Sequence, residues 1–139
     1  MIDFEAEIAA ITGYVPRGVS PNEAKKYIRL FCLLQDTSLL RIVAPEMKGS
    51  FGFLTAKPES FLGPIAVTPD ELGDLWYSKM ESGQLHVHLR GQKFGNIETG
   101  IDSLFHHGNT IDLIAQTRNF EAGTILGLGT ASNEAADND

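Results

Sequence analysis

The chain has 139 residues, a formal net charge of −7 and 42% apolar residues. This length and apolar content suit one modest domain with a real core and exclude a disordered chain. The acidic balance, with no basic run longer than Lys25-Lys26, argues against a nucleic-acid partner. No apolar stretch approaches the roughly 18 residues of a membrane span, and the N-terminus lacks a signal pattern. We therefore expect a cytoplasmic protein with no membrane association.

The first predicted element is a strand over residues 3–12, in which two carboxylates interrupt an apolar run. Glu5 and Glu7 are two residues apart, so on a strand their side chains leave the same face, roughly 7 Å from each other. One interpretation is a solvated edge strand with the alternating apolar side chains inward: Phe4, Ala6 and Ile8. The other is a metal platform, because two close carboxylates beside apolar neighbours repel each other unless a cation sits between them.

A loop and a short helix follow the first strand. Ser20-Pro21-Asn22-Glu23 has the form of a capping box, in which the Ser20 hydroxyl accepts from the Glu23 amide and the Glu23 carboxylate reaches back. We expect a helix from Pro21 to about Tyr27.

The apolar run after this helix is too continuous for a half-exposed helix and predicts a buried strand over residues 28–36. It contains the single cysteine, Cys32, which we expect to be buried and which cannot form an intrachain disulfide, as in a reducing compartment. The run ends in a polar cluster, where Asp36 by itself has the features of a turn or cap residue. Residues 43–50 are predicted as irregular loop, and Lys57 by itself as a solvated surface cation.

The remaining elements are predicted from local patterns. Thr68-Pro69-Asp70-Glu71 repeats the cap-then-proline form and predicts one or two helical turns that include Leu72. Asn109 is the expected cap of a helix to Gln116. Further strands are predicted over residues 64–67, 85–89 and 123–128.

The four histidines occur as two pairs. His86 and His88 have strand spacing and could share a metal, but with no third ligand nearby we interpret them as part of a half-exposed strand face. His106 and His107 are adjacent, and on a regular strand they would point to opposite faces, which disfavours joint ligation. We interpret both pairs as structural.

Five segments carry a wider pattern: residues 4–8 (FEAEI), 36–38 (DTS), 51–58 (FGFLTAKP), 65–73 (IAVTPDELG) and 121–133 (EAGTILGLGTASN). Taken together and in this order, they resemble the fumarylacetoacetate hydrolase family. The resemblance covers nearly the whole chain and corresponds to the middle part of that family's catalytic domain.

The resemblance implies a metal site and an activity. By position, Glu5, Glu7 and Asp36 match the family's ligands for a divalent cation, Mg²⁺ foremost, with Mn²⁺ or Ca²⁺ as alternatives, and three hard oxygen donors suit such an ion. Lys57 matches a lysine that neutralises charge developing on the substrate, and Thr130 matches a threonine that contacts it. The implied activity is metal-dependent hydrolysis of C–C bonds in β-diketo or 2-keto acids, of the fumarylacetoacetate or acylpyruvate type.

The sequence also departs from the family pattern. It holds no match to the His–Glu pair that activates water, so we identify no catalytic residue and the question whether the chain is an enzyme stays open. Leu40 stands where an arginine is expected, with Arg41 one place along, and Leu128 replaces a common serine. We expect a truncated or degenerate member. The alternative function is a non-catalytic remnant or binding module that pairs with a full-length homologue or forms a homodimer.

The implied fold is α+β and mainly β, the family's mixed β-roll with short helices, incomplete at both ends. A partial catalytic-type domain is expected over residues 1–133, and a frayed acidic tail over residues 134–139. Lost flanking strands would leave unpaired edges and exposed apolar surface, which predicts association, low stability, or both.

Overall fold

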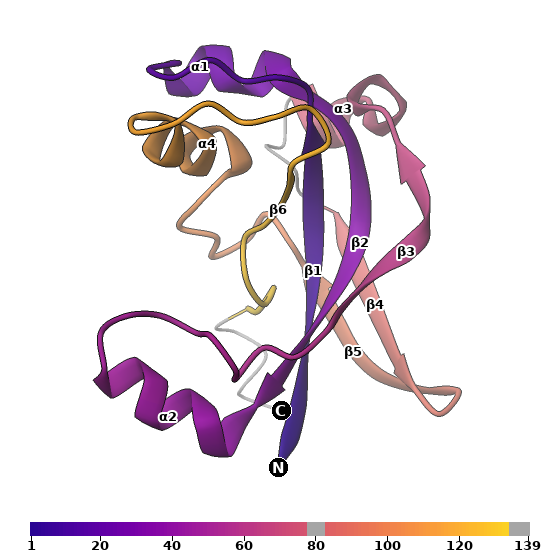
Figure 1. Ribbon diagram of the computed structural model, residues 1–139. Coiled ribbons are helices and arrows are strands. Elements are labelled where there is room, and N and C mark those ends of the chain that lie inside the picture. The colour runs from indigo at the N-terminus through magenta and orange to yellow at the C-terminus, as the bar shows by residue number, and fades with distance from the viewer. Residues whose placement is uncertain (78–82, 134–139) are drawn as a thin grey trace.

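The computed structural model describes residues 1–77 and 83–133 and is mixed α+β and rich in strands (Figure 1). Its main sheet is antiparallel, in the order β3-β2-β1-β6. The strands of this sheet are β1 (Ile2–Thr12), β2 (Ile28–Leu39), β3 (Ser60–Val67) and β6 (Ile125–Gly127). A separate antiparallel hairpin consists of β4 (Gln84–Leu89) and β5 (Gln92–Glu98).

Short helices lie at the two ends of the main sheet. Helices α1 and α4 lie side by side at one end, and α2 lies at the other end (Figure 1). Within the described ranges, no helix is long and apolar enough to cross a membrane. The helical elements are α1 (Pro21–Ala24), the 3₁₀ turn η1 (Lys25–Tyr27), α2 (Leu40–Lys48), the 3₁₀ turn η2 (Pro69–Leu72), α3 (Asp74–Tyr77) and α4 (His107–Ala115).

The pairing of β1 with β2 is the longest in the molecule and separates two chemically different faces. Its register runs from Ile2 opposite Leu39 to Thr12 opposite Ile28. Alternation along β1 places Phe4 on one face and Glu5 on the other. The Phe4 ring lies 5.7 Å from that of Phe94 in β5, so the hairpin covers the apolar face. The acidic face of the sheet points away from the hairpin.

The hydrophobic core lies where the helices at one end meet β1 and β2. Phe31 of β2 packs against Trp76 and His107, with ring centroids 5.2 and 5.5 Å away. Ile111 and Ala115 bury one stripe of α4 in the same cluster, as expected for an amphipathic helix. The core comprises Ala10, Val15, Val19, Ala24, Ile28, Phe31, Ile111, Ala115 and Phe120.

Most predicted elements are present. The first strand, the buried strand after the first helix and the helices that begin at Pro21 and Pro69 are confirmed, and Cys32 is buried and free. Strands are also found where residues 64–67, 85–89 and 123–128 predicted them, although the last spans only Ile125–Gly127. The predicted tail, residues 134–139, lies outside the described residues.

Two predictions about loops are wrong. The polar cluster after the apolar run is no turn, because β2 continues through Asp36 to Leu39. Residues 43–50 are mostly helical, since α2 runs to Lys48 with Pro45 inside it. Proline usually ends a helix because it lacks an N–H donor and clashes with the preceding turn. Here Glu46, the residue after Pro45, anchors the helix to another segment, which local pattern cannot show.

Smaller differences concern caps and one strand. The Ser20 hydroxyl donates to the Glu23 carboxylate at 2.9 Å and does not cap the helix, so the predicted capping box is wrong. Helix α4 begins at His107, two residues before the expected cap at Asn109. Strand β5 was not predicted. It follows a two-residue turn at Arg90-Gly91, where both residues have positive φ, the conformation of tight hairpin turns.

The outer strand β3 presents large apolar side chains to water. Phe61, Leu62 and Ile65 are 54%, 45% and 72% exposed. Exposed apolar surface of this kind agrees with the expectation from the sequence, whereas association itself stays a prediction.

Truncating Ile111 should lower the free energy of unfolding by about 2–5 kcal/mol, because the side chain is fully buried and Ile111→Ala leaves a cavity. Leu113 lies on the same helix and is 66% exposed, so Leu113→Ala is the matched control and should cost less than about 0.5 kcal/mol. Urea unfolding followed by circular dichroism compares the two variants. Equal losses would contradict this placement of α4.

Candidate metal centre

The strand register brings three carboxylates together on one face of the main sheet. Glu5 and Glu7 leave the same side of β1, and Asp36 of β2 lies directly opposite Glu5. One carboxylate oxygen from each residue lies within 4.8 Å of the others. We call these three residues the carboxylate cluster. Like charges placed opposite each other on a sheet are destabilising, so this arrangement needs compensation.

Lys57 supplies positive charge to the cluster. Its ammonium group forms ion pairs with Glu5 and with Asp36, the latter at 2.7 Å, and donates to the Ser38 hydroxyl at 2.8 Å. Lys57 therefore lies in the site and is not the freely solvated cation that its isolated position in the sequence suggested. Its side chain is only 23% exposed.

Hydroxyl groups from the two neighbouring strands hold the carboxylates in place. The Ser38 hydroxyl donates to Glu5 Oε1 at 2.5 Å, and the Ser60 hydroxyl donates to Asp36 Oδ1 at 2.6 Å. Ser60 is opposite Asp36 in the β2–β3 register. The positions of these carboxylates are thus fixed from β2 and β3 as well as from their own backbone.

Glu7 is the most buried member of the cluster, at 4% exposure. Its Oε2 atom accepts a hydrogen bond of 2.9 Å from the Gly129 amide. The packing at Gly127 is close, since a Cβ there would overlap Glu7 Oε2 and approach Leu34 Cδ2 to 2.8 Å, so these side chains would have to shift. The glycine-rich segment after β6 therefore approaches the carboxylate directly.

The surroundings separate the pKa values of the cluster. Burial raises the pKa of Glu7, and the charges of Glu5 and Asp36 raise it further, against the opposing effect of the Gly129 amide. Burial also favours the protonated form of Glu5 and Asp36. There it is outweighed by hydrogen bonds and by the Lys57 charge, so the pKa of each is held below its ordinary value.

The pKa of Lys57 shows the same balance. Burial favours the neutral amine, but Asp36 and Glu5 stabilise the ammonium more strongly and raise its pKa. At neutral pH the site therefore contains a permanent cation beside two ionised carboxylates and a more easily protonated third one. The donor set of three carboxylate oxygens fits a hard divalent cation.

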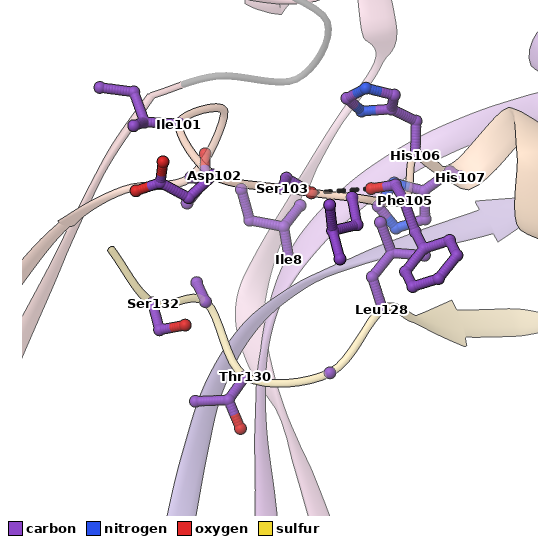
Figure 2. A pocket seen from close by; sticks show the side chains of 14 residues that line it. Ile8, Ile101, Asp102, Ser103, Phe105, His106, His107, Leu128, Thr130 and Ser132 are labelled. Atoms are coloured by element: carbon purple, nitrogen blue, oxygen red, sulfur yellow. Dashed lines mark hydrogen bonds between the residues drawn. The ribbon is translucent and has the colours of Figure 1, made fainter. Parts of the chain in front are cut away.

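Thr130 lies between the carboxylate cluster and a cavity. Its hydroxyl contributes a hydrogen bond that lowers the pKa of Glu5. A cavity of about 240 Å³ lies on the other side of the loop that carries Thr130, between residues 101–107 and 128–132. Figure 2 shows the Thr130 side chain directed away from Asp102 and His106 across this cavity. The cavity is therefore beside the carboxylate cluster and not over it.

The histidines lie apart from the carboxylate cluster. His86 and His88, on β4, line a second cavity of about 410 Å³ between the hairpin and the main sheet, and Glu7 is also part of its lining. His107 is buried against Phe31. Among the described residues, the group of side chains able to hold a metal is the carboxylate cluster alone. His106 lines the first cavity, and the interpretation of both histidine pairs as structural stays a prediction.

All five site residues expected from the sequence are found around one point. Sequence reasoning missed the supporting roles of Ser38, Ser60 and the Gly129 amide. Ser38 is two residues after Asp36, so an extended strand would have placed both on one face, but that cluster was interpreted as a turn. Ser60 and Gly129 could be found only from the strand pairing.

A model of the C-terminal domain of fumarylacetoacetate hydrolase matches residues 1–139. The chain belongs to the fumarylacetoacetate hydrolase family. A search of curated proteins found no match. The family assignment agrees with the resemblance seen in the sequence and with the mixed α+β fold.

Solved structures of fumarylacetoacetate hydrolase family proteins share the fold. The chain is similar to fumarylpyruvate hydrolase from Pseudomonas aeruginosa in complex with Mn²⁺ and pyruvate, with a TM-score of 0.77, 11% identity and coverage of 93% of this chain and 54% of the other. A fumarylacetoacetate hydrolase family protein from yeast matches with a TM-score of 0.76 and 16% identity, over 95% of this chain and 56% of the other. 5-Carboxymethyl-2-hydroxymuconate delta-isomerase from Mycobacterium smegmatis matches with a TM-score of 0.69 and 17% identity, over 95% of this chain and 49% of the other.

The chain thus spans about half the length of these structures. Identities this low establish the fold, and the fold is shared by a hydrolase and an isomerase, so it does not choose the reaction.

Glu7→Gln should stabilise the metal-free protein at pH 7, because the amide oxygen can still accept from Gly129 while the repulsion by Glu5 and Asp36 is removed. A raised pKa means that ionising Glu7 costs stability. The gain should therefore shrink as pH falls through the raised pKa of folded Glu7 and disappear below the ordinary value of 4.5, where wild-type Glu7 is protonated in both the folded and the unfolded state. Thermal melting of the variant and of wild type from pH 7 to pH 4 measures this difference in stability.

Glu5→Gln is the comparison for this prediction. The pKa of Glu5 is lowered, so its ionised form contributes stability above its ordinary pKa, and the variant should melt below wild type at pH 7. A melting temperature below wild type in both variants at pH 7 would contradict the opposite pKa shifts assigned to Glu5 and Glu7.

Proposed function

We propose that the carboxylate cluster binds a divalent cation and that a keto acid binds beside it, in a hydrolase acting on C–C bonds of β-diketo or 2-keto acids. The observation that carries this proposal is the approach of Glu5, Glu7 and Asp36 within 4.8 Å, from two strands. Mg²⁺ is our first choice, with Mn²⁺ or Ca²⁺ as alternatives. The Mn²⁺ and pyruvate complex of the similar Pseudomonas aeruginosa enzyme supports a divalent cation with a keto acid beside it.

The chain's own residues give the site its polarity. When bound, the cation would polarise an oxygen of the keto acid as a Lewis acid. Lys57 presents an ammonium group, partly buried and held at the cluster, that can neutralise negative charge on a substrate oxygen. Thr130 offers a hydroxyl at Glu5 from the glycine-rich loop. Both side chains interact with Glu5, so both lie beside the proposed keto-acid site.

Water activation is not assigned to any residue in this proposal. Among the described residues, His86 and His88 lie on β4, His107 is buried against Phe31, and His106 lines the cavity beside the loop that carries Thr130; none of them belongs to the carboxylate cluster. We therefore assign cation and keto-acid binding to named residues and treat cleavage as the property to be measured.

The second candidate function is a non-catalytic binding module that forms a homodimer or pairs with a homologue. The exposed apolar side chains of β3 favour it, because such surface gains stability when a partner covers it. Both candidates use the same carboxylate cluster, so they differ in cleavage and association rather than in cation binding.

Glu5→Gln should abolish Mn²⁺ binding in isothermal titration calorimetry, because the variant removes one of three charged donors and leaves Lys57 competing for the others. Glu71 is an exposed carboxylate in η2, so Glu71→Gln is the matched control and should bind Mn²⁺ like wild type. A wild-type protein that gives no calorimetric response to Mg²⁺ or Mn²⁺ would refute the metal proposal.

Lys57→Met should separate cation binding from keto-acid binding. Removing the ammonium leaves Glu5 and Asp36 free for a cation, so Mn²⁺ affinity should be equal or tighter. The response of the Mn²⁺-loaded protein to oxalate or pyruvate should fall by about tenfold or more, as expected for loss of a charged partner. An unchanged response to both anions would remove Lys57 from the site.

Activity on an acylpyruvate distinguishes the two candidate functions. Cleavage by the Mn²⁺-loaded wild type, lost in Lys57→Met, would support the hydrolase. Pyruvate binding without cleavage, together with a dimer in sedimentation, would favour the binding module.

A further inference from the structure

Glu46 makes an unusually dense set of contacts for a residue at the edge of the molecule. From α2, its carboxylate accepts hydrogen bonds from the amides of Leu54 at 2.8 Å and Thr55 at 2.9 Å. It also accepts from the Thr55 hydroxyl at 2.7 Å and from the Ala56 amide at 3.3 Å. Each of its two oxygens receives two of these four bonds. Three consecutive amides thus point at one carboxylate.

The segment held in this way leads directly to Lys57. Ala56 is fully buried, and its carbonyl accepts a hydrogen bond of 2.8 Å from the Leu39 amide at the end of β2. The backbone just before Lys57 is therefore fixed on one side by Glu46 and on the other by β2. The Lys57 side chain then reaches Glu5 and Asp36 from this fixed point.

Although the Phe53 ring centroid lies 5.6 Å from Lys57 Nζ, side chains add less than Glu46 to the hold on this segment. Its side chains Phe51, Phe53 and Leu54 are 81%, 46% and 69% exposed, so they add little packing. The Glu46 hydrogen bonds are charge-assisted and stabilise the ionised carboxylate, which lowers the pKa of Glu46 to about 2, with the Thr55 amide as the main cause. Glu46 is thus ionised throughout the neutral range.

We propose that Glu46 is a positioning residue: its carboxylate fixes residues 54–56 and thereby holds the Lys57 ammonium at the carboxylate cluster. Glu46 makes no contact with the cluster itself and acts through the backbone. The importance of this for keto-acid binding rests on the proposed function, whereas the position of Lys57 can be tested without it.

The decisive variant is Glu46→Gln, which changes no volume. A carboxylate accepts on both oxygens, but a glutamine amide nitrogen can only donate, so the variant leaves two of the four donors facing another donor. Glu59→Gln is the matched control, because Glu59 is an exposed carboxylate two residues after Lys57.

The first measurement is acetylation of lysines by acetic anhydride, quantified by mass spectrometry in the metal-free protein. An ammonium held in ion pairs reacts slowly. We expect Lys57 in Glu46→Gln to be labelled roughly tenfold faster relative to Lys48, which is exposed on α2, and Glu59→Gln to match wild type. Unchanged relative labelling of Lys57 would overturn the proposal.

The second measurement is pyruvate affinity of the Mn²⁺-loaded protein. Glu46→Gln should weaken pyruvate binding by about tenfold while Mn²⁺ affinity stays within about twofold, a split that general destabilisation would not produce. Equal losses for Mn²⁺ and pyruvate would overturn the proposal. If wild type binds neither Mn²⁺ nor pyruvate, the proposed function fails, and the labelling result alone decides the role of Glu46.

A milder pair of variants covers the case in which Glu46→Gln does not fold. Thr55→Val removes one of the four donors, and Thr55→Ser keeps it. We expect faster Lys57 labelling in Thr55→Val and recovery of the wild-type rate in Thr55→Ser. Equal rates in the two variants would overturn the proposal.

Discussion

The site depends on one electrostatic constraint, which is that the β1–β2 register forces Glu5 and Asp36 to face each other across a sheet. Two carboxylates in that position are unfavourable unless positive charge is nearby. Lys57 supplies that charge in the protein alone, and the hydroxyls of Ser38 and Ser60 satisfy further carboxylate oxygens. The same residues would share their oxygens with a bound cation, so the cluster is arranged to hold positive charge in either case.

The close approach of three carboxylates lowers the stability of the folded protein. Burying Glu7 beside two other carboxylates raises its pKa and costs folding energy, and a neutral side chain of the same shape would relieve that cost. Gly127 shows a related constraint, since any larger residue would displace the Glu7 carboxylate. Such locally unfavourable choices gather where a protein must bind a ligand.

The local sequence pattern was sufficient to predict part of the candidate site. The spacing of Glu5 and Glu7 placed them on one face because strand alternation is a local property. Asp36 and Lys57 entered through the family resemblance, since by themselves they suggested a turn residue and a surface cation. The bonds from Ser60 and Gly129 depend on long-range register, and the helix around Pro45 depends on Glu46 contacts with residues 54–56, so neither was visible in the sequence. That Glu5, Glu7 and Asp36 bind a metal stays a prediction.

The bond between the Gly129 amide and Glu7 spans 122 positions of the chain. Contacts that join such distant segments are slow to form, because the intervening chain must first be ordered. During synthesis, Glu7 leaves the ribosome long before its partner exists. A nascent chain therefore holds all three carboxylates of the cluster while Glu7 still lacks the Gly129 amide, which arrives only when the segment after β6 docks.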